Sequence, residues 1–507
     1  MKRILPLVFV AAVALYLPSI NYGFVQDDRA IIVTNPAAHS IGAALRAFRD
    51  PYWPRESGAG LYRPVTILSY ALDWSVSGGR AGWFHFINAI WHGVVTVLLV
   101  TILARWLSPI AAAAAGLVFA WHPVHVEAVA SLVGRAELLA AAGILGAVLA
   151  ARRGWWVAAV GLAALAMFSK EHGVIVGVVI LIDRWLQGPA GPSRYPLGFW
   201  IALAGVTVGF LAAWLAIGWV GASDAAAVFY GTGVGGRLAV ALPAILRAAV
   251  LLIWPASLSI DYNPQVLPAQ DGISAAAVLG AIVAIGIPAL AIWSRRRHRA
   301  LSFTASLAGL SYLPTANLLF PSGVVLAERN LYLAVALPAG LVATVLLWLD
   351  ARATRRAAVA AVSIMAAASV WRSIDRLPSW RDNRSQLVTL LAEHPESYRA
   401  HASAAAVLAG MSDTAGARRE YRMADSLFSG DPYVAAARAM YLLGIGDTSG
   451  AVPLVARARA GGAERMALRA EFLLALARRD RVRAVALVDS ANHRYPSDRS
   501  WYAKYLQ

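Results

Sequence analysis

The stretch ILPLVFVAAVALYLPSI at residues 4–20 is followed a few positions later by two adjacent carboxylates, Asp27 and Asp28. It is apolar and long enough to cross a bilayer, and Lys2 and Arg3 in front of it predict a cytoplasmic start. Because it lacks a small-residue cleavage site, we expect a retained span that delivers both acids to the outer membrane surface. An acidic pair there is either a solvated turn or the general base for an acceptor hydroxyl.

The composition extends this membrane interpretation to most of the chain. Of 507 residues, 59% are hydrophobic and 14% are charged, and the mean hydropathy is +0.59, as in a polytopic membrane protein. The net charge of +17 comes largely from arginines between hydrophobic segments, such as Arg152, Arg153 and the run 295–299. This pattern predicts membrane topology and contacts with anionic lipids rather than nucleic-acid binding. The absence of cysteine excludes disulfides, thiol catalysis and cysteine metal sites.

Eleven apolar segments have the length and hydropathy expected of membrane spans. They lie near 4–20, 84–104, 109–121, 133–150, 155–169, 173–187, 196–220, 274–293, 300–320, 331–349 and 356–371. A further segment, 237–255, carries Arg247 at its centre, and counting it as a span would place the basic run 295–299 outside. We therefore expect it to be interfacial or re-entrant on the outer face. We thus expect residues 1–372 to form an all-α polytopic membrane helix bundle of about eleven spans. Because this number is odd, the C-terminus is expected outside.

Beyond Trp371 the composition shifts to that of a soluble helical domain. Asp413, Asp447 and Asp480 are 34 and then 33 residues apart, and each is followed four positions later by Ala. This spacing matches the tetratricopeptide period, in which helix pairs bury their apolar faces by stacking on one another. We expect residues 383–507 to form a small tetratricopeptide-like α-solenoid; the alternative is a generic Ala-rich helical bundle.

Polar residues in or beside the spans are candidates for a site. Arg63, in the string Tyr62-Arg63-Pro64, opens an amphipathic segment expected along the outer surface, where it could meet headgroups or a lipid-linked phosphate. His85, Asn88 and His92 share one helical face, which leaves open either a ligand contact or hydrogen bonds that tie helices together.

A second group of polar residues enters the next span. His122, His125 and Glu127 invite a metal interpretation, but Pro123 separates the imidazoles, so they do not form the helical i, i+4 ligand pair. We assign no metal there. Arg135 and Glu137 fall at depths where charges are costly, which predicts either a functional or a mutually compensating role.

Two more charged clusters map to the outer side of the predicted topology. They are Lys170 with Glu171, where Glu171 is the simplest partner for the lysine, and Glu328 with Arg329. The charged candidates therefore all fall on one membrane face, whereas independent structural salt bridges would scatter over both faces. This shared face is the main reason to expect a site.

Six ordered motifs resemble the transmembrane and tetratricopeptide-repeat O-mannosyltransferases. They are Phe24-Val-Gln-Asp27-Asp28 with Asn35, Tyr62-Arg63-Pro64-Val-Thr66, His85-x-x-Asn88, His122-Pro-Val-His125-Val-Glu127 with Gly134-Arg135-Ala-Glu137, Lys170-Glu171-His-Gly173, and Ala327-Glu328-Arg329-Asn-Leu-Tyr332. The resemblance implies a GT-C glycosyltransferase fold, a polyprenyl-phosphate sugar donor, and an active site in the first extracytoplasmic loop with the base in the acidic pair. The Ala- and Arg-rich composition looks bacterial, which favours an inner-membrane protein and undecaprenyl phosphate.

The expected chemistry is an inverting sugar transfer to a hydroxyl acceptor, on protein Ser or Thr or another molecule, bound through the repeats. It needs one base, Asp27 or Asp28, and cations for the departing phosphate, for which Arg63, His125, Lys170 and Arg329 are candidates. We expect no cofactor, although the sequence leaves a divalent metal open. The remaining substrate-binding candidates are His85, His122, Glu127, Arg135, Glu171 and Glu328. The alternatives are a transporter or lipid flippase with a repeat docking domain, and a pure scaffold.

Overall fold

The computed structural model describes residues 1–54, 60–188, 195–218, 225–262, 267, 274–350, 355–495 and 498–506. Within these ranges the secondary structure is helical, with no strand. The bundle consists of α1 (Ile4–Tyr16), α2 (Ile41–Arg46), α3 (Pro64–Ser77), α4 (Ala81–Leu103), α5 (Pro109–Ala120), α6 (His125–Ala130), α7 (Arg135–Arg152), α8 (Trp156–Ser169), α9 (Val176–Gln187), α10 (Leu197–Ala213), α11 (Val234–Ile253), α12 (Ala275–Ser294), α13 (Arg299–Tyr312), α14 (Ala336–Asp350) and α15 (Arg355–Arg376). The chain is thus an all-α membrane helix bundle, as predicted.

Each of the eleven predicted segments contains a helix, although residues 219 and 220 of one segment lie outside the described ranges. Among the described residues, six helical stretches are long and apolar enough to cross a membrane: Ile4–Asn21, Ala81–Leu103, Leu132–Arg152, Leu197–Gly218, Val234–Ile253 and Ala275–Ser294. Shorter apolar helices lie at Pro109–Ala120, Trp156–Ser169 and Leu333–Trp348.

The helix α7 forms the centre of the bundle. In its apolar window 89% of the residues are buried, against 17% in α10 and α12, whose apolar side chains remain exposed for lipid contact. Small residues let α8 approach α7 closely, because a Cβ at Gly143 would lie 2.7 Å from the Leu162 carbonyl oxygen. The residues at the start of α7, Arg135, Ala136 and Glu137, are buried as well.

The helix α11 corresponds to the segment predicted to be interfacial or re-entrant. It is 20 residues long and apolar enough to cross. However, near its start Arg237 donates to the Leu318 carbonyl oxygen at 3.1 Å, and near its end the Leu252 carbonyl oxygen lies 3.1 Å from His122 Nε2. Leu318 follows α13 and His122 follows α5, at the end of the bundle that carries the cavity described below. Both ends of α11 thus contact segments at the same end of the bundle. The interfacial or re-entrant path of α11 stays a prediction.

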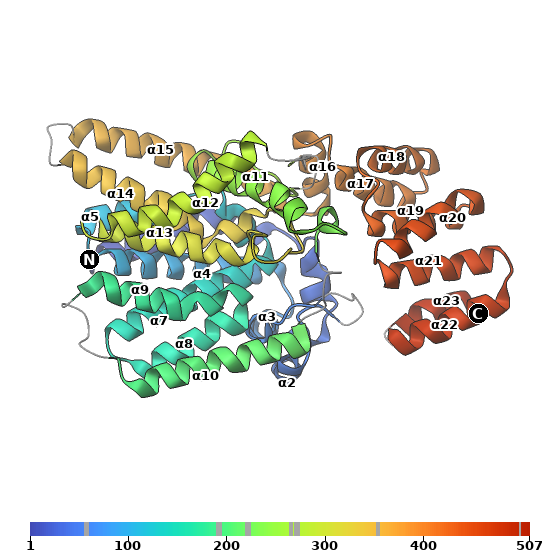
Figure 1. The fold of residues 1–507 in the computed structure, drawn as a ribbon, viewed down its shortest axis with the longest axis horizontal. Helices are drawn as coiled ribbons and strands as arrows, with labels where there is room; N and C mark the ends of the chain where they lie inside the picture. Colours follow the sequence, from blue (N-terminus) through green and yellow to red (C-terminus); the bar gives the residue numbers. More distant parts are fainter. Residues whose placement is uncertain are drawn as a thin grey trace.

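The C-terminal part lies beyond one end of the bundle, opposite the end that holds the N-terminus (Figure 1). It consists of α16 (Asn383–Glu393), α17 (Tyr398–Gly410), α18 (Thr414–Leu427), α19 (Pro432–Gly444), α20 (Thr448–Ala460), α21 (Glu464–Ala477), α22 (Arg481–Arg494) and α23 (Arg499–Leu506). The periodic aspartates Asp413, Asp447 and Asp480 are the N-caps of α18, α20 and α22. The repeat in the sequence therefore marks the second helix of successive helix pairs.

Residues where the two parts meet hold the turn after α1. The Gly23 backbone N–H donates to the Arg381 carbonyl oxygen at 3.0 Å, and the Gln26 N–H donates to Asn383 Oδ1 at 2.8 Å. Gln26 has φ 43°, a left-handed conformation that costs a non-glycine residue free energy unless its surroundings fix it. Asn383 supplies such a contact, so the start of α16 supports the turn that carries the acidic pair.

Candidate functional site

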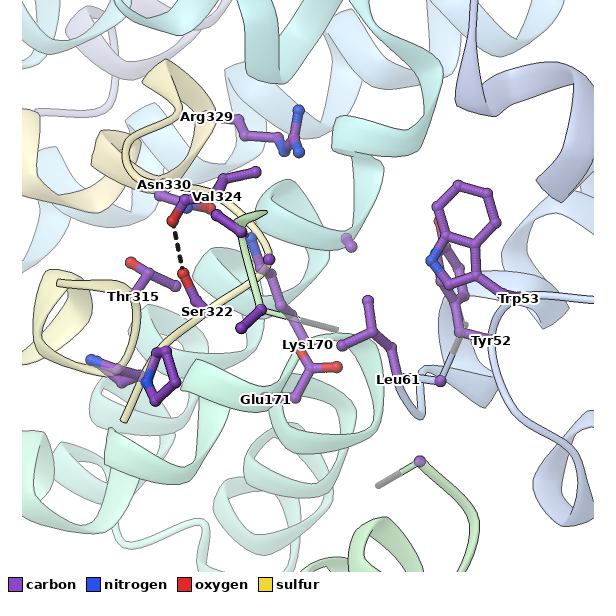
Figure 2. A pocket seen from close by; sticks show the side chains of 18 of the residues that line it. Tyr52, Trp53, Leu61, Lys170, Glu171, Thr315, Ser322, Val324, Arg329 and Asn330 are labelled. Atoms are coloured by element: carbon purple, nitrogen blue, oxygen red, sulfur yellow. Dashed lines mark hydrogen bonds between the residues drawn. The ribbon is translucent and has the colours of Figure 1, made fainter. Parts of the chain in front are cut away.

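A cavity of about 520 Å³ lies between the bundle and the helices α17 and α19 of the C-terminal part. Its wall comes from the turn after α1, the loop before α3, the start of α7, the residue pair after α8, the end of α10 and the segment between α13 and α14. Figure 2 shows Lys170 and Glu171 between the segment with Arg329 and Asn330 on one side and Tyr52 and Trp53 on the other. This volume is in the range of small-molecule sites in proteins.

The structure separates the two adjacent acids. Asp27 lines the cavity and is partly exposed. Asp28 is fully buried: its Oδ2 accepts the Val25 N–H and its Oδ1 accepts the Val133 N–H, both at 2.9 Å. The expectation that both acids sit at the water boundary is therefore wrong for Asp28, because successive side chains in this turn point to opposite sides.

Burial dominates the electrostatics of both carboxyl groups. It raises the pKa of Asp27, while the nearby Arg329 and Arg63 lower it and Glu127 adds to the increase. Burial also raises the pKa of Asp28 to about 7, despite the backbone N–H groups that favour its charged form. A raised pKa makes Asp27 a stronger base than an exposed aspartate.

The cations around the cavity form ion pairs that the sequence did not indicate. Arg63 Nε and Nη2 donate to Glu171 Oε1 and Oε2 at 3.0 and 2.8 Å. Lys170 donates to Glu137 and, at 3.1 Å, to Asn330 Oδ1. Glu171 is therefore not the partner of Lys170, and Glu137 does not compensate Arg135.

Arg329 pairs with Glu127 through both its backbone N–H and its guanidinium. The Glu127 side chain is 2% exposed and the Arg329 side chain 30% exposed, so the arginine reaches the cavity and its partner does not. Arg63, Lys170 and this arginine are cationic side chains that the bundle contributes to the cavity wall, which also holds Asp27. These groups therefore line one cavity, and their placement on one membrane face stays a prediction.

Arg135 lies outside the cavity wall. Its guanidinium is fully buried, donates to Asp73, Asn88 Oδ1 and the Phe84 carbonyl oxygen, and packs over Tyr70. Asp73, on α3, is the compensating charge, so the expectation that Arg135 pairs with Glu137 is wrong, and a role of Arg135 in substrate binding stays a prediction. Of the two possibilities for Asn88, the structure shows the tie between helices.

The three predicted site histidines, His85, His122 and His125, also lie outside the cavity wall. His85 Nε2 lies 3.3 Å from the Gly23 carbonyl oxygen, His122 Nε2 contacts the Leu252 carbonyl oxygen, and His125 Nε2 lies 2.9 Å from the Tyr332 carbonyl oxygen. Burial lowers the pKa of His122 to about 4 and that of His125 well below its ordinary value. Burial thus favours the neutral form of both rings, and neither side chain reaches the cavity, so a phosphate contact by His125 stays a prediction.

Glu328 lies outside the cavity wall and is hydrogen-bonded to neighbouring segments of the bundle. It is fully buried, accepts the Ser259 N–H at 2.7 Å and the Tyr262 hydroxyl at 2.9 Å, and lies 3.9 Å from Arg376 at the end of α15. Burial raises the pKa of Glu328 to about 7. These contacts hold the segment that carries Arg329 and Asn330 against the segment after α11 and the end of α15.

Some residues of the cavity wall were not predicted. They include Tyr52, Trp53, His172, Asn330, Arg399, Asp431 and Tyr433. Asn330 directly follows the charged pair Glu328 and Arg329, and this position in the sequence could have indicated that it belongs to the site. No sequence feature indicates the C-terminal residues, because a helical repeat does not show which of its helices meet the bundle. Among the described residues, no group of three or more His, Asp or Glu side chains is arranged to hold a metal ion.

The fold and the cavity define a class: an all-α membrane protein with a charged, solvent-accessible cavity at one end of its bundle. Its sequence is similar to several proteins that are all named protein O-mannosyl-transferases. A stretch of 135 residues, 25% of this chain, is 41% identical to "Protein O-mannosyl-transferase Tmtc2" of Drosophila melanogaster and covers 14% of that protein. Over 377 residues, 65% of this chain, it is 28% identical to "Protein O-mannosyl-transferase TMTC3" of Mus musculus and covers 40% of it.

A longer alignment of 470 residues, 79% of this chain, is 25% identical to "Protein O-mannosyl-transferase TMTC4" of Mus musculus and covers 63% of that protein. The chain therefore spans less than two thirds of each of these relatives. Neither a family model nor a solved structure matches it. The relatives support the resemblance drawn from the six motifs.

Proposed function

We propose that this chain is a membrane glycosyltransferase that transfers a sugar, mannose by analogy with the relatives' names, from a polyprenyl phosphate to a hydroxyl acceptor. The observation that carries the proposal is the position of Asp27 on the wall of a 520 Å³ cavity that also holds Arg63, Lys170 and Arg329. One carboxylate and several cations are the groups that this reaction requires.

The reaction assigns a separate role to each charge. The acceptor oxygen attacks the anomeric carbon of the sugar, the carbon–oxygen bond to phosphate breaks, and the bonding electrons leave with the phosphate. Asp27 takes the proton of the acceptor hydroxyl. Because a lipid phosphate is already a good leaving group, no general acid is needed, and the cations stabilise the negative charge that the phosphate gains.

The three cations are positioned before a donor arrives. Glu171 holds Arg63 in a two-point contact, Glu127 holds Arg329, and Glu137 with Asn330 holds Lys170. A donor phosphate would share these cations with their carboxylates, and a fixed guanidinium loses little conformational freedom when it binds. Glu127, Glu137 and Glu171 are in this view orienting groups, and Asp28 and Glu328 fix the backbone.

The apolar side of the cavity fits a lipid donor. Trp53, Leu61 and Trp214 line it, and Trp214 lies at the end of α10, whose outer surface is exposed for lipid contact. A polyprenyl chain could lie along this side while its phosphate reaches the cations. The acid-bearing face is, in this proposal, extracytoplasmic, because Lys2 and Arg3 begin α1 at the other end.

The remaining assignments follow from the same resemblance. We assign the bundle to the GT-C type and the helix pairs of the C-terminal part to a tetratricopeptide-like solenoid. We also place the protein in a bacterial inner membrane, with undecaprenyl phosphate as the lipid and a protein Ser or Thr as the acceptor. No cofactor enters the scheme.

The test is donor turnover by the purified full-length protein. It is incubated with defined polyprenyl-phosphate sugars and with a Ser- and Thr-containing peptide, and free polyprenyl phosphate and glycopeptide are measured. We expect both products to form with a mannosyl donor. Absence of lipid-phosphate release from every donor offered would reject the proposal.

A further inference from the structure

Part of the cavity wall belongs to the C-terminal helix pairs and has no role in the donor chemistry. Arg399 lies on α17, and Asp431 and Tyr433 lie at the start of α19, yet all three line the cavity that holds Asp27. The first helices of the first two helix pairs, α17 and α19, thus contribute to the wall of the site itself.

Arg399 is held in place by neighbours from both parts of the chain. Its Nε donates to the Tyr398 hydroxyl at 2.9 Å, and its Nη1 lies 3.4 Å from Asp261 Oδ1 of the bundle. Tyr398 in turn donates to Asp431 Oδ2 at 2.8 Å, and Asp431 Oδ1 accepts the Tyr433 N–H at 2.9 Å as the N-cap of α19. The guanidinium is therefore oriented in advance, and its side chain remains 38% exposed.

Tyr433 adds an aromatic surface beside this cation. Its side chain is 45% exposed although its backbone is fixed by Asp431. An exposed, backbone-anchored tyrosine offers a large contact area at low entropic cost. Arginine and tyrosine together suit an extended polypeptide, because its carbonyl oxygens accept from the guanidinium while its side chains pack on the ring.

The size of the cavity restricts how a protein acceptor enters. A volume of about 520 Å³ admits a sugar phosphate and a short chain segment but no folded domain. The apolar side near Trp214 is allotted to the lipid, which leaves the side of the helix pairs for the acceptor. Residues 373–507 carry 19 basic and 14 acidic side chains, a net charge of 19 − 14 = +5, which favours acceptors with acidic flanks.

We propose that Arg399 and Tyr433 form the acceptor subsite, which binds an extended, preferably acidic, polypeptide segment and directs its hydroxyl towards Asp27. This inference rests on the proposed function and names the acceptor side of the same cavity. Asp431, Tyr398 and Asp261 act as positioning residues for Arg399.

The test compares peptide transfer with donor hydrolysis by water in the full-length protein. For Arg399→Ala and Tyr433→Ala, the ratio of peptide transfer to hydrolysis should fall about tenfold, mainly through a higher KM for the peptide. Arg399→Lys should recover part of this loss, and a peptide with acidic flanks should outperform its neutral counterpart. Arg422→Ala, on the exposed surface of α18 and outside the cavity wall, is the matched control and should keep the ratio.

A photo-crosslinking residue placed at position 433 gives a readout that does not depend on turnover. It should capture a labelled peptide, whereas the same residue at position 422 should not. Unchanged ratios in both the Arg399 and Tyr433 variants, with the donor still turned over, would overturn the inference alone. Peptide capture at 433 without any donor turnover would instead reject the proposed function and retain the subsite.

Discussion

The carboxylate of Asp28 accepts the backbone N–H of Val133 at 2.9 Å, although the two residues lie 105 positions apart in the chain. This hydrogen bond joins the turn after α1 to the start of α7, the most buried helix of the bundle. Asp27 is the residue directly before Asp28 in this turn. The hydrogen bond between Asp28 and Val133 therefore also fixes the proposed base relative to Glu137 and Lys170. In the proposed reaction, Asp28 is thus a positioning residue for Asp27.

Replacing Asp28 with asparagine should destabilise the protein. The carboxylate accepts two backbone N–H groups, and an amide has one acceptor oxygen, so one buried N–H would lose its partner. An unpaired buried donor costs about 1–3 kcal/mol. We expect a lower unfolding temperature in detergent for Asp28→Asn and a much smaller change for Asp27→Asn. Equal stability of the two variants would contradict the structural role of Asp28.

Asn383→Ala should slow sugar transfer without weakening donor binding. Asn383 Oδ1 accepts the Gln26 N–H, and Gln26 holds a left-handed conformation in the turn that carries Asp27. Loss of this contact lets the turn relax, and a small displacement of the base lowers the rate of the chemical step. Steady-state kinetics should show a several-fold lower kcat with a nearly constant donor KM. A pure KM effect would show that Asn383 does not position the base.

The contact at Asn383 also bears on truncation. Removing residues 383–507 deletes this support, so such a truncation is expected to impair donor turnover as well as acceptor binding. A truncation that ends after Glu393 retains α16 and separates the two effects.

Arg135 and Asp73 should behave as a structural pair. The Arg135 side chain is fully buried and that of Asp73 is 9% exposed, so removing either partner leaves a buried charge. Arg135→Met and Asp73→Leu should each destabilise the protein by about 3 kcal/mol, and the double variant by less than their sum. Thermal unfolding of the four proteins measures the coupling. Strict additivity would mean that the two charges do not depend on each other.

The rate of transfer should rise with pH through the pKa of Asp27. Only the ionised carboxylate accepts a proton, and burial raises its pKa above the ordinary value of 3.8. The acid limb of kcat/KM should therefore have a midpoint above that value. Arg329→Gln removes a cation that lowers the pKa of Asp27, so it should shift this midpoint upward whatever it does to donor affinity. An unshifted midpoint would assign the acid limb to another group.

The sequence predicted the helices better than the contacts between them. Apolar segments and arginine positions reflect the bilayer directly, so each predicted span contains a helix. The same topology placed Asp27, Arg63, Lys170 and Arg329 near one another, and the structure has all four on the wall of one cavity. The sequence did not decide whether α11 crosses the membrane or lies at its surface. A helix with Arg247 near its centre has both the length of a span and the charge pattern of an interfacial segment.

The partners of the charges could not be inferred from their order in the chain. Lys170 and Glu171 are neighbours in sequence, yet the lysine pairs with Glu137 of α7 and the glutamate with Arg63 before α3. Adjacent residues leave a turn in different directions, and this also separates Asp27 from Asp28. The role of Arg399 depends on which helix pair meets the bundle, which a repeat pattern does not encode.

The most direct measurement is release of polyprenyl phosphate and formation of glycosylated peptide by Asp27→Asn, compared with the unmodified protein and with Asp375→Asn. Asp375 is a matched control because its side chain is 56% exposed and lies outside the cavity wall. Removal of a general base should lower the transfer rate by about 10²–10⁴-fold while the unfolding temperature stays nearly constant. Asp375→Asn should remain fully active. A folded Asp27→Asn protein that transfers sugar at the unmodified rate would contradict the account.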